Sequence, residues 1–178
     1  MPYSTSSTPR LRARPVSPPF HVVLVEPEIP PNTGNVARLC AASASPLHLV
    51  GPLGFRIDEH SVRRAGVDYW HLVDVRTHGS FDHFVDSFRA ESPKGNVHLF
   101  SAGVAGNYLD AGYEPGDALV FGKESIGLSE ELLARFPGRV RTIPTLGPVR
   151  SLNLANAVGI VLFEGLRQTG VLRDTFVG

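Results

Sequence analysis

The sequence predicts an α/β fold in which a mostly parallel sheet is covered by helices on both faces. Three observations support this prediction. Short runs of β-branched and other apolar residues recur along the chain, segments with helical spacing separate them, and no internal repeat or linker interrupts the pattern after residue 20. Strands that alternate with helices favour parallel pairing, and a parallel sheet is normally buried on both faces.

Each element is predicted from its local pattern. Runs rich in Val, Leu, Ile and Phe predict strands at residues 22–25, 47–50, 72–75, 97–100, 118–121 and 140–143. Helical spacing predicts helices at residues 35–44, 59–64, 81–89, 130–136 and 152–168. The last helix has the strongest pattern, because its apolar residues recur every three or four positions. Asn156 interrupts that apolar run, so we expect it to have a buried partner.

The composition is that of one globular domain. The chain has 178 residues, of which 42% are hydrophobic and 19% charged, and its net charge is zero. This neutrality argues against binding of nucleic acid over the whole surface, although a local basic patch can still serve. The single cysteine, Cys40, allows no internal disulfide and fits a reducing compartment. Since no apolar run approaches the roughly 20 residues that cross a bilayer, we expect a cytoplasmic protein without membrane contact.

The two ends differ from the middle of the chain. Residues 1–19 are rich in Ser, Thr, Pro and Arg and poor in large apolar side chains, which predicts a disordered basic tail. Arg10, Arg12 and Arg14 precede the first acidic residue of the chain. The tail is either a variable extension without a role or a loose arm that contacts RNA. The folded domain is then expected over residues 20–172, with a short C-terminal tail at 173–178.

Ligands of open parallel sheets bind at the carboxyl ends of the strands, and three unusual loops follow such ends here. The first spans residues 26–35, where prolines fix the exit from the strand and Asn32 or Asn35 can cap the next helix. Amides at that helix start favour an anion such as a phosphate. Arg38 lies within about two turns, where a cation gains nothing from the helix dipole. It is either a solvated surface residue or one aimed at a ligand.

The second loop spans residues 121–128. Its Gly-Lys pair is not part of a phosphate-binding P-loop, because Asp117 and Glu124 stand where that motif requires a glycine and a hydroxyl residue. Gly122 nevertheless lets the backbone approach a ligand closely. A plain turn is the alternative.

The third loop runs from residue 143 to the start of the last predicted helix. Gly147 and Pro148 form a turn within it. Ser151 or Asn153 can then satisfy amides at the helix start, which have no partner inside the helix. Such a concentration of polar groups at one end of a core helix indicates a site.

Other kinds of chemistry find little support. None of the seven histidines pairs at metal-ligand spacing and Cys40 has no partner, so we expect no metal. The Gly-x-Ser-x-Gly pattern of a serine hydrolase is missing. Arg63 and Arg64 lie near Tyr69 and Trp70, a combination that suits phosphate contact and base stacking. A solvated face is the alternative for this pair.

Taken together, the three loops resemble the three motifs of the SPOUT RNA methyltransferases. The first motif matches residues 26–35 with Arg38, and the second matches Phe-Gly-x-Glu-x-x-Gly-Leu at residues 121–128. The third matches Ile-Pro followed by Arg-Ser-Leu-Asn-Leu-x-Asn-Ala-Val, within residues 143–158. The likeness covers about residues 21–170. It is closest to the small subfamily that methylates the ribose of the wobble nucleotide of tRNA.

The resemblance implies a trefoil knot in the C-terminal part, a homodimer and S-adenosylmethionine as the cofactor. The cofactor would lie near Ala102, Gly122 and Ile143, with Ser151 and Leu152 beside it. The substrate would be the anticodon stem-loop of tRNA. Ribosomal RNA as substrate, or an RNA-binding dimer without activity, are the alternatives.

The resemblance also implies roles for polar residues. Arg38 would approach the acceptor ribose and help its 2′-hydroxyl to lose the proton, while Ser151 and Asn153 would orient the reactants. Glu124 would shape the second loop and face the partner subunit. RNA would be contacted by Asn35, Arg38, Arg63 and Arg64.

Overall fold

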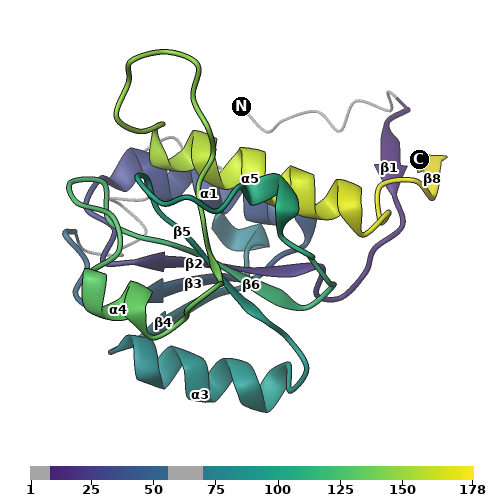
Figure 1. Cartoon of the computed structure of the whole chain (residues 1–178). Coiled ribbons are helices and arrows are strands. Elements are labelled where there is room, and N and C mark those ends of the chain that lie inside the picture. Colours follow the sequence, from purple (N-terminus) through teal and green to yellow (C-terminus); the bar gives the residue numbers. More distant parts are fainter. Residues whose placement is uncertain (1–8, 56–69) are drawn as a thin grey trace.

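Six strands form one parallel sheet at the centre of the computed structural model, which describes residues 9–55 and 70–178 (Figure 1). Their order in the sheet is β4-β3-β2-β6-β5-β7, and every adjacent pair is parallel. The strands are β2 (Phe20–Val25), β3 (Leu47–Val50), β4 (Val75–His78), β5 (Val97–Phe100), β6 (Asp117–Phe121) and β7 (Val140–Arg141). The predicted α/β fold class is confirmed.

Helices cover both faces of this sheet. The helices are α1 (Pro30–Ser43), α3 (Phe81–Glu91), α4 (Glu130–Ala134) and α5 (Leu154–Gln168), with 3-10 turns η1 (Trp70–Leu72) and η2 (Tyr108–Asp110). One core cluster packs α1 and α5 on one face, and a second packs α3 and α4 on the other (Figure 1). Alternation along β2 explains this division, because Val22 and Leu24 belong to the first cluster and Val23 to the second.

Several predicted boundaries are wrong. The strand predicted at residues 72–75 begins only at Val75, because the preceding residues form the η1 turn, in which the Val73 amide donates to the Trp70 carbonyl at 3.2 Å. The strand predicted at 140–143 ends at Arg141, and Pro144 has no N–H that could continue the pairing. The helix predicted at 59–64 lies outside the described residues.

The start of α1 also differs from the prediction. The helix begins at Pro30, and Ile29 occupies the capping position without a side-chain cap. Two prolines fill the first turn, where their missing N–H groups are not needed. Asn32 and Asn35 therefore lie inside the helix, and the prediction that one of them caps it is wrong.

Helix α5 buries one stripe and exposes another. The capping residue is Asn153, whose side chain accepts hydrogen bonds from two backbone amides of the first turn. Asn156 is exposed, so the prediction that it has a buried partner is wrong. It shares the outer stripe with Ile160 and Phe163, which are 38% and 45% exposed.

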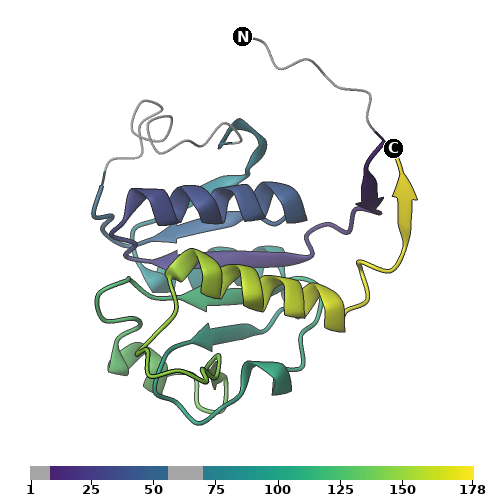
Figure 2. The ribbon, with the colours of Figure 1, turned by 90° about the horizontal axis from the view of Figure 1, so that it is seen from above.

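The two ends of the chain pair with each other. Strand β1 (Leu11–Ala13) and strand β8 (Thr175–Val177) form a two-stranded antiparallel ribbon beside the C-terminal end of α5 (Figure 2). The prediction that residues 1–19 form a disordered tail is therefore wrong for residues 11–13, and the C-terminal tail contains a strand. Neither end can make these hydrogen bonds alone, so the pattern of each end by itself gives no sign of them.

The segment at residues 140–142 lies between two other parts of the chain. On one side the amide of Ser101, directly after β5, donates to the Arg141 carbonyl at 3.0 Å. On the other side the Thr142 amide donates to the carbonyl of Gly106 at 2.7 Å, and the Tyr108 amide donates to the carbonyl of Thr142 at 3.0 Å. A strand enclosed by a loop in this way suits a threaded chain. The trefoil knot itself stays a prediction.

Three buried histidines form a chain across neighbouring strands beneath α3. Nδ1 of His21 lies 3.0 Å from Nε2 of His48, and Nδ1 of His48 lies 2.9 Å from Nε2 of His78. The other ring nitrogen of His21 lies 3.2 Å from the Ser92 hydroxyl. Burial, with smaller effects of the two neighbouring histidines, lowers the pKa of His48 to about 3.

Candidate functional site

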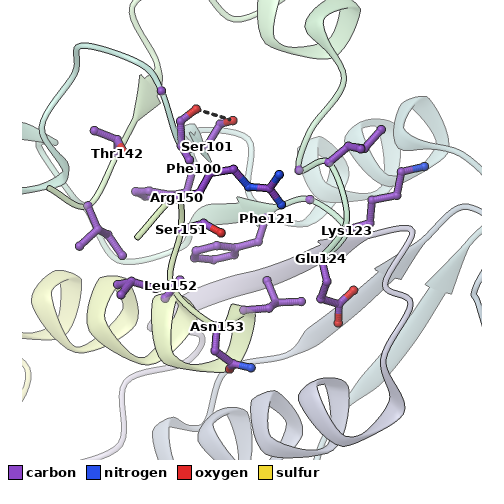
Figure 3. Close-up of a pocket in the computed structure, with 18 of the residues that line it drawn as sticks. Phe100, Ser101, Phe121, Lys123, Glu124, Thr142, Arg150, Ser151, Leu152 and Asn153 are labelled. Atoms are coloured by element: carbon purple, nitrogen blue, oxygen red, sulfur yellow. Dashed lines mark hydrogen bonds between the residues drawn. The ribbon is translucent and has the colours of Figure 1, made fainter. Parts of the chain in front are cut away.

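A cavity of about 940 Å³ opens where the three unusual loops meet, at the carboxyl ends of β5, β6 and β7 (Figure 3). The volume is in the range of small-molecule sites. The six residues predicted to hold a cofactor or orient the reactants at this point all line it: Ala102, Gly122, Ile143, Ser151, Leu152 and Asn153. The structure thus brings together residues that are up to 51 positions apart.

The walls of the cavity combine apolar surface with hydroxyl groups. The rings of Phe100 and Phe121 stack with centroids 5.0 Å apart, and both residues line the cavity. Ile143 and the residues that open α5 add further apolar surface. Ser101, Thr142 and Ser151 contribute hydroxyl groups. Such a lining fits a ligand with a flat apolar part and several hydrogen-bonding atoms.

Reciprocal hydrogen bonds join the first loop to the second. The Glu124 carboxylate accepts hydrogen bonds from the backbone amides of Glu28 (2.8 Å) and Ile29 (3.2 Å). It also accepts one from the side-chain amide of Asn32 at 2.9 Å. In return, the Glu28 carboxylate accepts hydrogen bonds from the amide and hydroxyl of Ser125 at 3.0 and 2.9 Å. Glu124 thus holds the entrance of α1 against the second loop.

Asn153 joins the third loop to this arrangement. Its side-chain oxygen caps α5 by accepting hydrogen bonds from the amides of Ala155 (2.9 Å) and Asn156 (3.3 Å). Its side-chain nitrogen donates to the side-chain oxygen of Asn32 at 2.9 Å. Because Asn32 also bonds Glu124, one chain of hydrogen bonds runs through all three loops and fixes the cavity wall.

Gly122 is the point where the second loop folds back on itself. A Cβ at this position would lie 2.1 Å from the carbonyl carbon of Gly127 and 2.2 Å from the nitrogen of Leu128. Both neighbours are backbone atoms, so no side chain could move aside. The loop closes at this point only because residue 122 is a glycine.

A comparison with protein families identifies the chain. The model of the SpoU rRNA Methylase family matches residues 19–163, which is most of the sequence. The chain belongs to this family.

Relatives of this SpoU methylase are named after one reaction. The tRNA (cytidine(34)-2'-O)-methyltransferase of Burkholderia pseudomallei (strain 1106a) is 48% identical over 153 residues, which cover 85% of this chain and 96% of that protein. The protein of the same name from Polaromonas sp. (strain JS666 / ATCC BAA-500) is 46% identical over 152 residues, covering 85% and 92%.

The chain is also similar to solved structures. One, described as structural insights into the 2-OH methylation of C/U34 on tRNA, has a TM-score of 0.78 at 49% identity and covers 85% of this chain and 96% of that one. The AdoMet-bound rRNA methyltransferase of Sinorhizobium meliloti has a TM-score of 0.72 at 30% identity, covering 83% of this chain and 56% of that chain.

Two of the four residues predicted to contact RNA, Asn35 and Arg38, are described by the structure and do not line the cavity of this SpoU methylase. Asn35 and Arg38 are exposed on α1, three positions apart and therefore on one face of the helix. Arg38 lies six residues beyond Asn32, or about 9 Å along the helix axis. Arg63 and Arg64 lie outside the described residues.

Sequence reasoning placed three charged residues within the motif loops but gave them no role in the site. Arg150 precedes Ser151 in the third motif, and its guanidinium extends into the cavity (Figure 3). Lys123 pairs with Glu26 at 2.8 Å, and this hydrogen bond raises the pKa of Lys123. Glu26 adopts a φ of 51°, which is unusual for a residue other than glycine. The sequence feature that could have indicated these residues is the presence of acidic and basic side chains within the three motif loops.

Two absences hold for the part of the chain that the structure describes. Within it, no three His, Cys, Asp or Glu side chains are grouped so that they could hold a metal ion. No helix there is long and apolar enough to cross a membrane.

Proposed function

We propose that this chain transfers a methyl group from S-adenosylmethionine to the ribose 2′-hydroxyl of the wobble nucleotide of tRNA, a cytidine or uridine. The observation that carries the proposal is the cavity at which all three motif loops converge, with every predicted cofactor residue in its lining. The names of relatives at 46–48% identity support the choice of tRNA as substrate. A cytoplasmic location belongs to the same proposal.

The cavity lining fits the cofactor. Its apolar part, which includes Ile143, Leu152 and Leu154, suits an adenine ring. We infer that the backbone near Ala102 and Gly122 holds the ribose and that Ser151 orients the methionine part. All three residues line the cavity. When bound, S-adenosylmethionine supplies the electrophilic methyl group on its sulfonium.

The chain must then make a ribose hydroxyl reactive at neutral pH without a histidine in the motifs. Holding the hydroxyl in line with the methyl group removes much of the barrier, up to roughly 7–11 kcal/mol in ideal cases. We infer that Arg38 approaches the acceptor ribose and stabilises the alkoxide that develops there. Asn35 on the same face of α1 would contact the neighbouring RNA, as would Arg63 and Arg64.

Replacement of Arg38 tests this role. We expect Arg38→Ala to lower methyl transfer by about 100-fold or more, the size typical of a lost group at a developing oxyanion. Cofactor affinity should stay nearly unchanged, because Arg38 lies outside the cavity lining. Single-turnover assays with calorimetry measure both quantities, and Arg38→Lys serves as the charge-preserving control. Near-normal turnover of Arg38→Ala would show that this arginine is only a surface residue.

We also infer a homodimer. The stripe of α5 that contains Ile160 and Phe163 presents apolar surface to solvent in the single chain. A second copy packed on this stripe would remove that surface from water.

Mapping of total tRNA from strains with and without the gene tests the substrate. We expect ribose methylation at the wobble position to vanish in the deletion strain and to return with the wild-type gene. Unchanged wobble methylation would contradict the proposal, and loss of a ribosomal RNA methylation instead would favour the rRNA alternative. Calorimetry tests the remaining alternative, an RNA-binding dimer without activity. Folded protein that does not bind S-adenosylmethionine would favour that alternative.

A further inference from the structure

The ribbon formed by β1 and β8 lies far from the cavity. Helix α5 connects the two regions, because its first residues line the cavity and its last turn leads toward β8 (Figures 1 and 2). The helix has 15 residues, so its ends are about 22 Å apart. The ribbon also lies outside residues 19–163, to which the family match is confined. It is therefore an addition to the part of the chain that defines the family.

The pairing register gives the ribbon two different faces. Arg12 lies opposite Phe176, while Leu11 lies opposite Val177. Directly opposed residues of antiparallel strands share a face, and successive residues alternate between faces. Arg12 and Phe176 therefore share one face with the flanking Arg10 and Arg14. The Arg14 guanidinium indeed lies 6.0 Å from the centre of the Phe176 ring.

The arginine face carries positive charge that the ribbon does not neutralise. Arg14 forms an ion pair with Asp174 at 3.0 Å. Arg10 and Arg12 are exposed. Within the described part of the chain, their guanidinium groups have no hydrogen-bond or ion-pair partner. Since the whole chain has zero net charge, this face is a local concentration of positive charge.

The chemistry of this face suits RNA. Guanidinium groups bind phosphate oxygens with two hydrogen bonds, and an aromatic ring between them offers a surface on which an unpaired base can stack. Phe176 is 41% exposed, so its ring is accessible. A protein partner would instead be expected on the opposite face, where Leu11 and Val177 are 73% and 67% exposed.

We propose that the face formed by Arg10, Arg12, Arg14 and Phe176 is a second RNA-binding surface. This proposal rests on the proposed function, because it assigns the surface to the tRNA substrate. The surface contacts the tRNA backbone at a distance from the nucleotide that enters the cavity. It therefore contributes to substrate affinity and leaves the chemical step unchanged.

Replacement of the two unpaired arginines tests the surface in the full chain. We expect Arg10→Gln with Arg12→Gln to reduce the salt dependence of tRNA binding by about 2 in the slope of log K against log salt concentration, about 1 for each phosphate contact. The KM for tRNA should rise several-fold, whereas kcat and the affinity for S-adenosylmethionine should not change. Fluorescence anisotropy at 50–200 mM salt and steady-state methylation measure these quantities.

Two control variants distinguish loss of the arginine face from loss of surface charge in general and from other changes to the ribbon. Arg89→Gln with Lys94→Gln removes the same charge from exposed positions on and beside α3, and it should leave the slope near the wild-type value. Leu11→Thr with Val177→Thr changes the other face of the same ribbon and should behave like wild type. Equal slopes for the Arg10/Arg12 variant and the α3 control would overturn the proposal.

The outcomes also separate this proposal from the proposed function. If the wild-type protein methylates tRNA and the Arg10/Arg12 variant binds it equally well, only the ribbon surface is refuted. If the wild-type protein binds tRNA through the ribbon but methylates none, the enzymatic function is refuted and the surface stands. Wild-type protein that binds no tRNA refutes both.

Discussion

At the scale of single residues, Asn153 combines two structural roles at the edge of the cavity. Its oxygen caps α5 and its nitrogen bonds Asn32, so both ends of the side chain amide are occupied. The sequence suggested a cap, and the resemblance suggested a site residue. The structure shows the cap and adds a link between two loops, which leaves the catalytic role as a proposal.

Two replacements of Asn153 separate the cap from the link. Asn153→Ser keeps an oxygen that can cap the helix but loses the donor to Asn32. We expect Asn153→Ala to cost about 1 kcal/mol of stability through loss of the cap, and Asn153→Ser to cost less. Urea unfolding checks the stabilities. If methyl transfer is lost equally in both variants, the amide serves the reaction; near-normal turnover of Asn153→Ser would show that its role is the cap.

The histidine chain leads to a prediction about pH. Burial lowers the pKa of His48 to about 3, and burial also lowers the pKa values of His21 and His78. His48 therefore stays neutral in the folded protein, while the unfolded chain takes up a proton on this ring below about pH 6.5. Stability is fully present above that pH and falls as the pH is lowered toward 3, by about 1.4 kcal/mol per pH unit for each additional proton on the unfolded chain.

NMR titration of the histidine rings checks this directly. We expect the His48 ring resonances to stay constant from pH 8 to pH 5 in the folded protein, and urea unfolding to show falling stability over the lower part of that range. A His48 ring that titrates near pH 6.5 would contradict the assignment of a neutral, hydrogen-bonded chain.

At the scale of elements, the second loop depends on one backbone contact. Gly122→Ala would place a methyl group on the backbone of Gly127 and Leu128, so the loop must open. We expect cofactor affinity to fall by at least about tenfold. Gly147→Ala is the matched control, because a Cβ there meets no atom within 4 Å and should leave affinity unchanged. Calorimetry with S-adenosylmethionine decides, and equal affinities for both variants would contradict the role given to Gly122.

The elements also show what a sequence pattern can and cannot predict. The strands at residues 47–50 and 97–100 were predicted to the residue, since strands buried on both faces read as continuous apolar runs. The prediction of a buried partner for Asn156 was wrong. The spacing of apolar residues predicts a helix but does not show which of its stripes faces solvent in the single chain.

Contacts between distant residues lay beyond any local pattern. The hydrogen bonds that Glu124 accepts from the amides of Glu28 and Ile29 join positions more than 90 residues apart. The β1–β8 ribbon joins the two ends of the chain. These residues become neighbours only when the whole chain folds, so the sequence around each of them does not indicate its partner. Of the six predicted residues in the cavity lining, Gly122, Ser151 and Asn153 were indicated by their own loops. Ala102, Ile143 and Leu152 were predictable only through the resemblance of the motifs.

At the scale of the whole molecule, one chain exposes an apolar stripe that a second copy can cover. Phe163 stands at the middle of α5 on this stripe and is 45% exposed, and Ile160 lies one turn before it. The same helix opens at the cavity, since Leu154 and Ala157 line it. A partner packed on the stripe would therefore lie close to the site and would fix the position of its wall.

We expect Phe163→Arg to convert the dimer into a monomer, because a charge in an apolar interface is left without a partner. Light scattering after size exclusion measures the mass. Leu72→Arg is the matched control, since Leu72 is 61% exposed at the η1 turn, which contacts α1, and should keep the wild-type mass. If the dimer braces the cavity, the monomer also binds S-adenosylmethionine more weakly. A Phe163→Arg protein that stays dimeric would place the interface elsewhere, whereas a wild-type monomer with full activity would show that the site is complete in one chain.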